Sequence, residues 1–232
     1  RAFARADRVL APSDFLAREF VSWGVDVRVI PNVLSLEAYP FVRRTSARPA
    51  ILWMRTFHEH YDPLTAVRTL ARLVEDHPEV KMTMGGADHG LLGATQAEAD
   101  RLGVRDRIEF PGYLRGEDKV RALRDHDFFL NTNVVDNMPV SVLEASASGM
   151  VPVATAVGGI PALLADGVEA ELAPAGDDRA LAGAIDRLLR ESDRYARLAQ
   201  GARRMAERSG WPNVHELWED QLHTLLPELV AP

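Results

Sequence analysis

Short apolar runs alternate with amphipathic stretches along almost the whole chain. This alternation is typical of parallel strands that are each followed by a helix covering the sheet. We expect strands at 8–11, 27–30, 50–55, 81–85, 107–110, 128–131, 151–154 and 169–172. We expect helices at 14–23, 63–76, 95–102, 116–124, 139–148, 160–165, 178–190, 193–208 and 214–226. The pattern therefore predicts an α/β fold with a doubly wound parallel sheet and a purely helical C-terminal extension.

One irregular stretch interrupts this pattern. Residues 33–49 lack clear periodicity and contain a Tyr-Pro pair and two consecutive arginines, so we expect a linker or an extended crossover there. Residues 1–32 before it form a single βαβ piece, which is too small to bury a core alone. Residues 50–208 form the main domain, and 209–232 form a terminal helix.

Composition excludes several classes of protein. The net charge of −7 argues against a nucleic acid as the main partner, because a phosphate polymer would be repelled. The absence of cysteine excludes disulfides and suits a cytoplasmic protein. No apolar run approaches the ~20 residues of a membrane span, and no signal peptide is visible. The first residue is Arg rather than Met, from which we expect a fragment, a processed product or a trimmed form.

A pair of carboxylates stands out near one predicted helix. Asp136 lies at the helix entrance and Glu144 eight positions later, about 12 Å along the axis. The helix begins at or near Pro139, so the backbone N–H groups of Asn137 to Val140 face the incoming loop as an anion site. An anion site flanked by two hydroxyl acceptors matches the layout of a nucleotide diphosphate sugar.

Other site chemistries find no support. The chain has no P-loop motif, no Cys/His cluster and no Gly-x-Ser-x-Gly motif. Asp125, Asp127 and Asp136 could suggest a cation, but the first two form an ordinary turn before a buried strand. We therefore expect neither a metal nor another cofactor.

Taken together, several segments resemble the carboxy-terminal half of retaining GT-B glycosyltransferases, in the large family called glycosyltransferase group 1 or family 4. The segments are 29–32, Arg55, Gly85 with Gly86, 108–113, 136–144 and 158–161. The resemblance implies a Rossmann-like donor domain that binds a nucleotide sugar at the carboxyl ends of its strands. Residues 1–32 would then be a remnant of the acceptor domain, and the missing N-terminal half or a partner chain would hold an unknown acceptor. The terminal helix would pack back on that other domain or simply cover the core.

The resemblance assigns roles to three side chains. Arg55, just past a strand, would bind the pyrophosphate, because a guanidinium suits a bidentate phosphate contact; otherwise it is a surface arginine. Glu144 would accept the ribose hydroxyls. Asp136, where the family normally has Glu, would face the transferred sugar, cap the helix, or do both.

The leaving-group site departs from the family pattern. The family usually places a lysine a few residues after this arginine, whereas residues 58–61 read His-Glu-His-Tyr. His60 or Tyr61 would substitute for the lysine, unless the histidine is an exposed loop residue. The candidate catalytic residues are therefore Arg55, His60, Asp136 and Glu144.

The resemblance also implies donor contacts from the loops after the strands and from the helix entrance. The predicted donor-binding residues besides Arg55, Asp136 and Glu144 are Gly85, Gly86, Gly112, Tyr113, Leu114, Asn133, Asn137, Met138, Pro139 and Val140.

Three functions stay open at this point. The first is the donor half of a retaining transferase that moves a hexose from a UDP- or GDP-sugar to an acceptor. The second is a nucleotide-sugar-binding module that is inactive alone. The third is a GT-B-like epimerase acting on the same donors.

Overall fold

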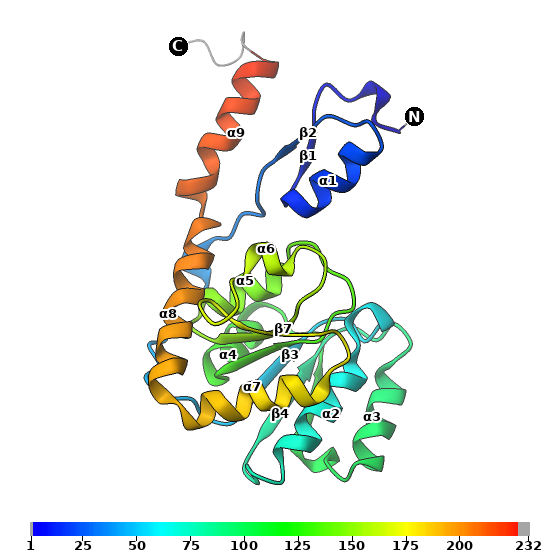
Figure 1. Cartoon of the computed structure of the whole chain (residues 1–232), viewed down its shortest axis with the longest axis vertical. Coiled ribbons are helices and arrows are strands. Elements are labelled where there is room, and N and C mark those ends of the chain that lie inside the picture. Colours follow the sequence, from blue (N-terminus) through cyan, green and yellow to red (C-terminus); the bar gives the residue numbers. More distant parts are fainter. Residues whose placement is uncertain (1, 227–232) are drawn as a thin grey trace.

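The computed structural model describes residues 2–226 and contains one large parallel sheet and one small one (Figure 1). The large sheet has the order β5-β4-β3-β6-β7-β8, and all its neighbouring pairs are parallel. Its strands are β3 (Ala50–Met54), β4 (Lys81–Gly85), β5 (Ile108–Gly112), β6 (Phe128–Asn131), β7 (Val151–Thr155) and β8 (Glu171–Ala173). This is the doubly wound arrangement that the alternating pattern predicts.

Helices cover both faces of the large sheet. One hydrophobic core lies under α2 (Pro63–Leu73), α3 (Leu92–Arg101) and α7 (Asp178–Arg190). The other lies under α4 (Gly116–Asp125), α5 (Val140–Ala147) and α6 (Ile160–Leu163). The long helix α8 (Ser192–Arg208) contributes to both cores. Side chains of a strand alternate between the two faces, so Ile51 and Trp53 belong to the first core and Leu52 to the second.

The strand order reverses direction between β3 and β6. From β3 the chain proceeds outward to β4 and β5, and from β6 it proceeds the opposite way to β7 and β8. The loops that leave the carboxyl ends of β3 and β6 therefore diverge and open a crevice, which is where open α/β sheets bind ligands. Arg55 follows β3 directly and Asn133 lies two residues past β6.

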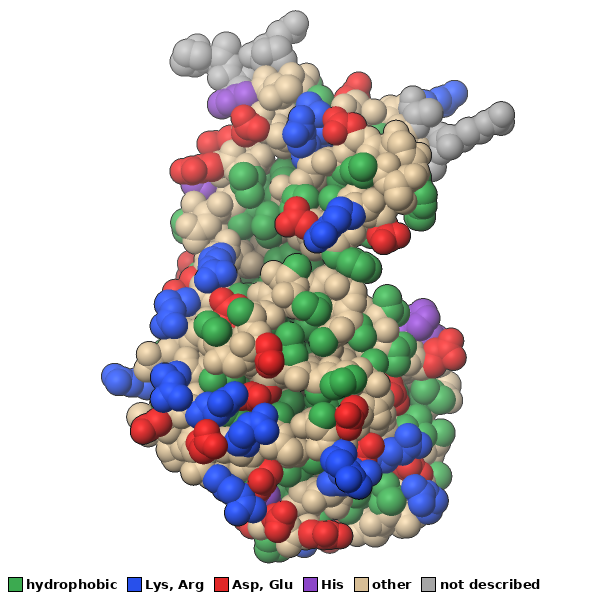
Figure 2. Space-filling view, viewed as in Figure 1, with side chains coloured by type: hydrophobic (Ala, Val, Ile, Leu, Met, Phe, Trp, Pro, Cys, Tyr) green, Lys and Arg blue, Asp and Glu red, His purple; other side chains and the backbone are tan. Residues whose placement is uncertain are grey.

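The N-terminal segment stands apart from the large sheet (Figure 1). Strands β1 (Val9–Ala11) and β2 (Val27–Val29) pair in parallel, and α1 (Asp14–Ser22) connects them. The last helix, α9 (Trp211–Leu225), rises beside this segment. Figure 2 shows a hollow between the N-terminal segment and the main body, and a cavity of about 210 Å³ lies where they meet.

The helix α9 differs from the prediction mainly at its start. It begins at Trp211 rather than 214, because Pro212 fits the first turn of a helix, where its missing N–H costs nothing. Residues 227–232 of the predicted terminal helix lie outside the described residues. Val214 is the buried residue of α9, while Trp211, Leu217 and Leu222 are exposed. The helix therefore covers little of the core.

The predicted linker 33–49 is held against the main domain by hydrogen bonds. Leu34 is buried and its N–H donates to the Ser209 carbonyl at 2.7 Å. The buried guanidinium of Arg44 donates to Asp127 at 2.9 Å and to the carbonyl groups of Arg124 and His126 at the end of α4. This segment is therefore an ordered crossover rather than a free tether.

Other boundaries also shift by a few residues. The helix α3 starts at 92 rather than 95, because the Asp88 carboxylate accepts the N–H groups of Gly90 and Leu92 and so orders the turn before it. The helix α2 ends at Leu73 rather than 76. The strand β8 starts at Glu171 rather than 169, because residues 166–170 close a turn in which the Gly167 N–H donates to the Ala170 carbonyl.

Candidate active site

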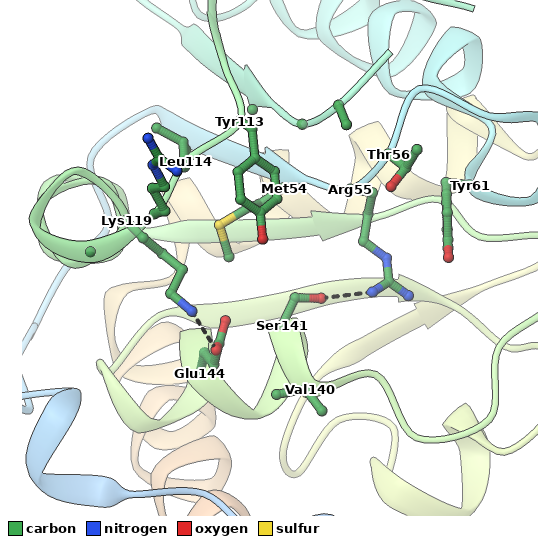
Figure 3. A pocket seen from close by; sticks show the side chains of 15 residues that line it. Met54, Arg55, Thr56, Tyr61, Tyr113, Leu114, Lys119, Val140, Ser141 and Glu144 are labelled. Atoms are coloured by element: carbon green, nitrogen blue, oxygen red, sulfur yellow. Dashed lines mark hydrogen bonds and ion pairs between the residues drawn. The ribbon is translucent and has the colours of Figure 1, made fainter. Parts of the chain in front are cut away.

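A pocket of about 340 Å³ lies at the carboxyl edge of the large sheet, in the crevice beside α5 (Figure 3). Arg55 and Lys119 lie on opposite sides of it, with Ser141 between them. The lining residues are Met54, Arg55, Thr56, Tyr61, Gly85, Gly86, Ala87, Tyr113, Leu114, Arg115, Gly116, Lys119, Val140, Ser141 and Glu144.

Arg55 is held in place by its backbone and by its side chain. Its N–H donates to the Gly85 carbonyl at 3.1 Å, and a Cβ on Gly86 would lie 1.7 Å from the Arg55 carbonyl oxygen, so only glycine fits there. The guanidinium donates to Ser141 Oγ at 3.0 Å and stacks over the Tyr61 ring at 4.6 Å. Burial lowers the pKa of Arg55 and the charge of Asp136 opposes this shift, so the group stays a cation.

Asp136 uses both of its carboxylate oxygens within the protein. Oδ2 accepts from the side chains of Arg55 and Asn133, and Oδ1 accepts the Asn137 N–H at 2.7 Å. The Asp136 carbonyl accepts the Gly159 N–H at 3.0 Å, and a Cβ on Gly158 would lie 1.9 Å from that carbonyl oxygen. The Gly-Gly turn therefore clamps the loop that carries Asp136. Asp136 therefore contacts Arg55 but is not among the residues that line the pocket.

Glu144 lies on α5 at the wall of the pocket, and two donors share one of its oxygens. Oε1 accepts from Lys119 Nζ at 2.7 Å and from the Tyr39 hydroxyl at 2.6 Å. The side chain of Glu144 is 10% exposed and that of Lys119 is 25% exposed. The carboxylate is therefore desolvated but compensated by a cation.

The pocket brings together about half of the residues predicted from the sequence. Arg55, Gly85, Gly86, Tyr113, Leu114, Val140 and Glu144 line it. Gly112, Asn133, Asp136, Asn137, Met138, Pro139 and His60 do not. His60 is exposed and its ring packs on His58 at 4.6 Å, whereas its neighbour Tyr61 faces Arg55.

The helix entrance lies next to Pro139 as predicted, but the Asn137 N–H before it is not free for an anion. Helix α5 begins at Val140, with Pro139 in extended conformation as the cap. The N–H of Asn137 is used by the Asp136 carboxylate, and the Asn137 side chain accepts from Ser13 of the N-terminal segment. The side-chain amide of Asn32 donates a hydrogen bond to the Met138 carbonyl at 3.0 Å. An anion at this site would meet the N–H groups of Val140 and Ser141, which have no partner within the helix.

The sequence interpretation missed Ser141, Lys119 and Tyr39. Ser141 could have been found, because a residue three positions before Glu144 lies on the same helix face. The chain has only two lysines, Lys81 and Lys119, which is the one signal that sets Lys119 apart. Tyr39 carries no local signal, since it lies in the irregular segment 33–49.

Two further observations concern metals and membranes. Within residues 2–226, no group of three or more His, Asp or Glu side chains is placed to hold a metal ion. No helix in the same range is both long and apolar enough to cross a membrane.

Comparison with known proteins places these features in a family. The family "Glycosyl transferases group 1" matches residues 40–205. D-inositol 3-phosphate glycosyltransferase of Mycobacterium sp. (strain KMS) is 31% identical over 199 residues, which are 79% of this chain and 45% of that protein. The protein of the same name from Stackebrandtia nassauensis is 32% identical over 204 residues, or 82% of this chain and 45% of that protein. The chain spans about half the length of these two relatives.

Solved structures agree on the fold. Anabaena Alr3699/HepE in complex with UDP-glucose superposes with a TM-score of 0.86 at 20% identity, covering 96% of this chain and 65% of that one. The C-terminal domain of a glycosyl transferase group 1 family protein (LpcC) from Francisella tularensis gives a TM-score of 0.66 at 15% identity, covering 75% of this chain and 96% of that one. With a GT-B-type α/β fold and a family match over more than half its length, this chain belongs to the glycosyl transferases group 1 family.

Proposed function

We propose that this chain binds a nucleotide diphosphate sugar, a UDP- or GDP-hexose, as the donor half of a retaining glycosyltransferase. The observation that supports this most is one pocket, at the reversal point of the sheet, with Arg55 on one side and the Glu144 carboxylate on the other. A nucleotide sugar needs this combination of a cation for its diphosphate and an acceptor for its ribose hydroxyls.

The donor would lie across the pocket in one orientation. The ribose would meet Glu144, and the diphosphate would meet Arg55 and the first N–H groups of α5. The base would lie by Gly85, Gly86 and the Tyr113–Leu114 backbone. Figure 3 supports the order, since Ser141 at the start of α5 stands between the Glu144 and Arg55 side chains.

The chemical contribution of this half would be electrostatic. In a retaining transfer the transition state resembles an oxocarbenium ion while the diphosphate leaves with growing negative charge. A buried, already oriented guanidinium stabilises that charge without rearranging at the moment of reaction. Arg55 fits this role, because Asp136, Ser141 and Tyr61 fix its position.

The family and its relatives support a transferase, and the acceptor would be bound outside the residues of this pocket. Because the chain spans about half of its mycobacterial relative, a donor-binding module that needs a further half for transfer is the second candidate function. Hydrolysis of a nucleotide sugar by the 232-residue chain alone would favour a catalytic unit over a passive module.

Calorimetric titration of the chain with UDP, GDP and ADP tests the proposal. We expect UDP or GDP to bind, and binding of none of the three at millimolar ligand would refute the donor site. An Arg55→Ala variant should lose affinity for the diphosphate but not for the bare nucleoside. Arg105→Ala is the matched control, because Arg105 also stacks on an aromatic ring, at 4.8 Å from the Phe110 centroid, but lies outside the pocket.

A further inference from the structure

Lys119 is one of two lysines in a chain whose other cations are arginines, and it is the one that reaches the pocket. It extends from α4 toward α5, where its Nζ donates to Glu144 Oε1 at 2.7 Å and to the Tyr39 hydroxyl oxygen at 3.2 Å. The Tyr39 hydroxyl in turn donates to the same Glu144 oxygen at 2.6 Å. The three groups form a closed triangle on one side of the Glu144 carboxylate.

The two carboxylate oxygens of Glu144 differ in their hydrogen-bond donors. Oε1 receives both donors, while no donor among the described residues reaches Oε2. Figure 3 shows that this second oxygen points up from α5 into the pocket. An ionised carboxylate accepts at both oxygens, so the side facing the pocket is left for hydroxyl groups of a ligand.

Both donors keep their protons at neutral pH. Burial lowers the pKa of Lys119, but the hydrogen bonds with Glu144 and Tyr39 outweigh it and the pKa is raised overall. Burial and the neighbouring Glu144 raise the pKa of the Tyr39 hydroxyl. Lys119 therefore remains an ammonium group and Tyr39 a hydroxyl donor.

We propose that Lys119 and Tyr39 are positioning residues that orient Glu144 so that its free oxygen meets the ribose diol of the donor. This inference rests on the proposed function. A glutamate side chain has several rotatable bonds, and ordering it on binding would reduce affinity; two fixed donors order it beforehand. Tyr39 belongs to the segment 33–49, so that crossover becomes part of the donor site.

The experiment compares a nucleoside diphosphate with its 2′-deoxy form. Dissociation constants for UDP and 2′-deoxy-UDP are measured by calorimetry on the parent chain, Lys119→Met, Tyr39→Phe and the control Lys81→Met; GDP and 2′-deoxy-GDP replace them if the parent chain binds GDP. Lys81 is the exposed second lysine at the start of β4. The parent and the control should prefer the ribose form by about tenfold, as a hydrogen bond to a charged group implies.

Each positioning variant should lose roughly three- to tenfold in affinity for the ribose form while its affinity for the deoxy form changes less than about twofold. In a Glu144→Gln background, Lys119→Met should cause no further loss of the preference, because both changes act through one carboxylate. Tyr39→Phe removes only a hydroxyl group, so it tests the inference even if Lys119→Met fails to fold.

Equal losses for both ligands would overturn the inference, because Lys119 would then act on the diphosphate or on the fold. An unchanged preference, or tighter binding of the ribose form by the variants, would overturn it as well. If the parent chain bound a nucleoside diphosphate and its 2′-deoxy form equally well, the contact between Glu144 and the ribose would be refuted, but the proposed donor site would stand. A parent chain that binds no diphosphate would instead remove the proposed function itself.

Discussion

Asp136 and Glu144 lie in the same segment and each pairs with a cation, but the protein uses their oxygens differently. Arg55, Asn133 and the Asn137 N–H occupy both oxygens of Asp136. Lys119 and Tyr39 occupy only one oxygen of Glu144. A carboxylate with no free oxygen has little left for a ligand, whereas one with a free oxygen at a pocket wall can bind hydroxyl groups. The comparison supports our proposal that the Asp136 end holds Arg55 in place and that the Glu144 end is available to a ligand.

The largest expected effect is a loss of stability when the turn that holds the Asp136 loop is altered. Gly158 has φ +56°, and a Cβ there would lie 1.9 Å from the Asp136 carbonyl oxygen, so Gly158→Ala must displace that loop. We expect the free energy of unfolding to fall by about 3 kcal/mol. Urea denaturation measures it, with Gly93→Ala on α3 as the control because its Cβ would meet nothing within 4 Å. If Gly158→Ala were as stable as the parent, the inference that this turn holds the Asp136 loop would be wrong.

The second prediction concerns the Glu144 end. Glu144→Ala removes the acceptor that we propose for the ribose hydroxyls and should weaken UDP binding by about 2 kcal/mol, or roughly 30-fold. Calorimetry measures the dissociation constant, and Glu117→Ala, an exposed glutamate on α4, serves as the control. Parent-like affinity in Glu144→Ala would sink the ribose assignment.

The third prediction separates the two carboxylates directly. Asp136→Asn keeps the shape but weakens the pairing with Arg55, whose side chain is 14% exposed, so we expect a loss of about 1 kcal/mol in unfolding free energy. The affinity for UDP should change less than about threefold. The sugar contact predicted from the sequence remains testable here. A selective loss of UDP-sugar affinity, with UDP affinity kept, would show that Asp136 faces the sugar.

The smallest effect concerns the anchoring of α4, which carries Lys119. His126 contacts the Ala122 carbonyl at 2.7 Å and Thr83 Oγ1 at 2.8 Å, and burial lowers its pKa. The unfolded chain therefore binds the proton more readily than the folded chain. The contribution of neutral His126 to the free energy of unfolding is fully present above about pH 6.5 and is lost as the pH falls toward the pKa of His126 in the folded chain. Urea unfolding at pH 7.5 and 5.5 should show a smaller pH dependence in His126→Gln than in the parent. An equal dependence in both would assign the loss to other groups.

Local patterns explain why much of the fold was predictable. The alternation of buried strands and amphipathic helices needs only neighbouring residues, so the strands of the large sheet were placed within a few positions. Arg55 and Glu144 were predicted from the resemblance to the family pattern, and the structure brings both to the pocket at the carboxyl edge of the sheet. Boundaries set by a cap, such as Asp88 before α3, were misplaced because the cap acts across a turn.

Periodicity in the sequence was enough to predict the α/β class and the doubly wound sheet, because it depends only on neighbouring residues, and the resemblance to a known family pointed to Arg55 and Glu144. Tertiary packing sets the difference between the two carboxylates: both oxygens of Asp136 accept hydrogen bonds within the protein, whereas one oxygen of Glu144 has no donor among the described residues. Tyr39 and Lys119 lie 105 and 25 positions from Glu144, and no local pattern links such distant residues. Their convergence depends on how the crossover 33–49 and α4 pack against α5, which is why the partners of Glu144 appear only in the folded chain.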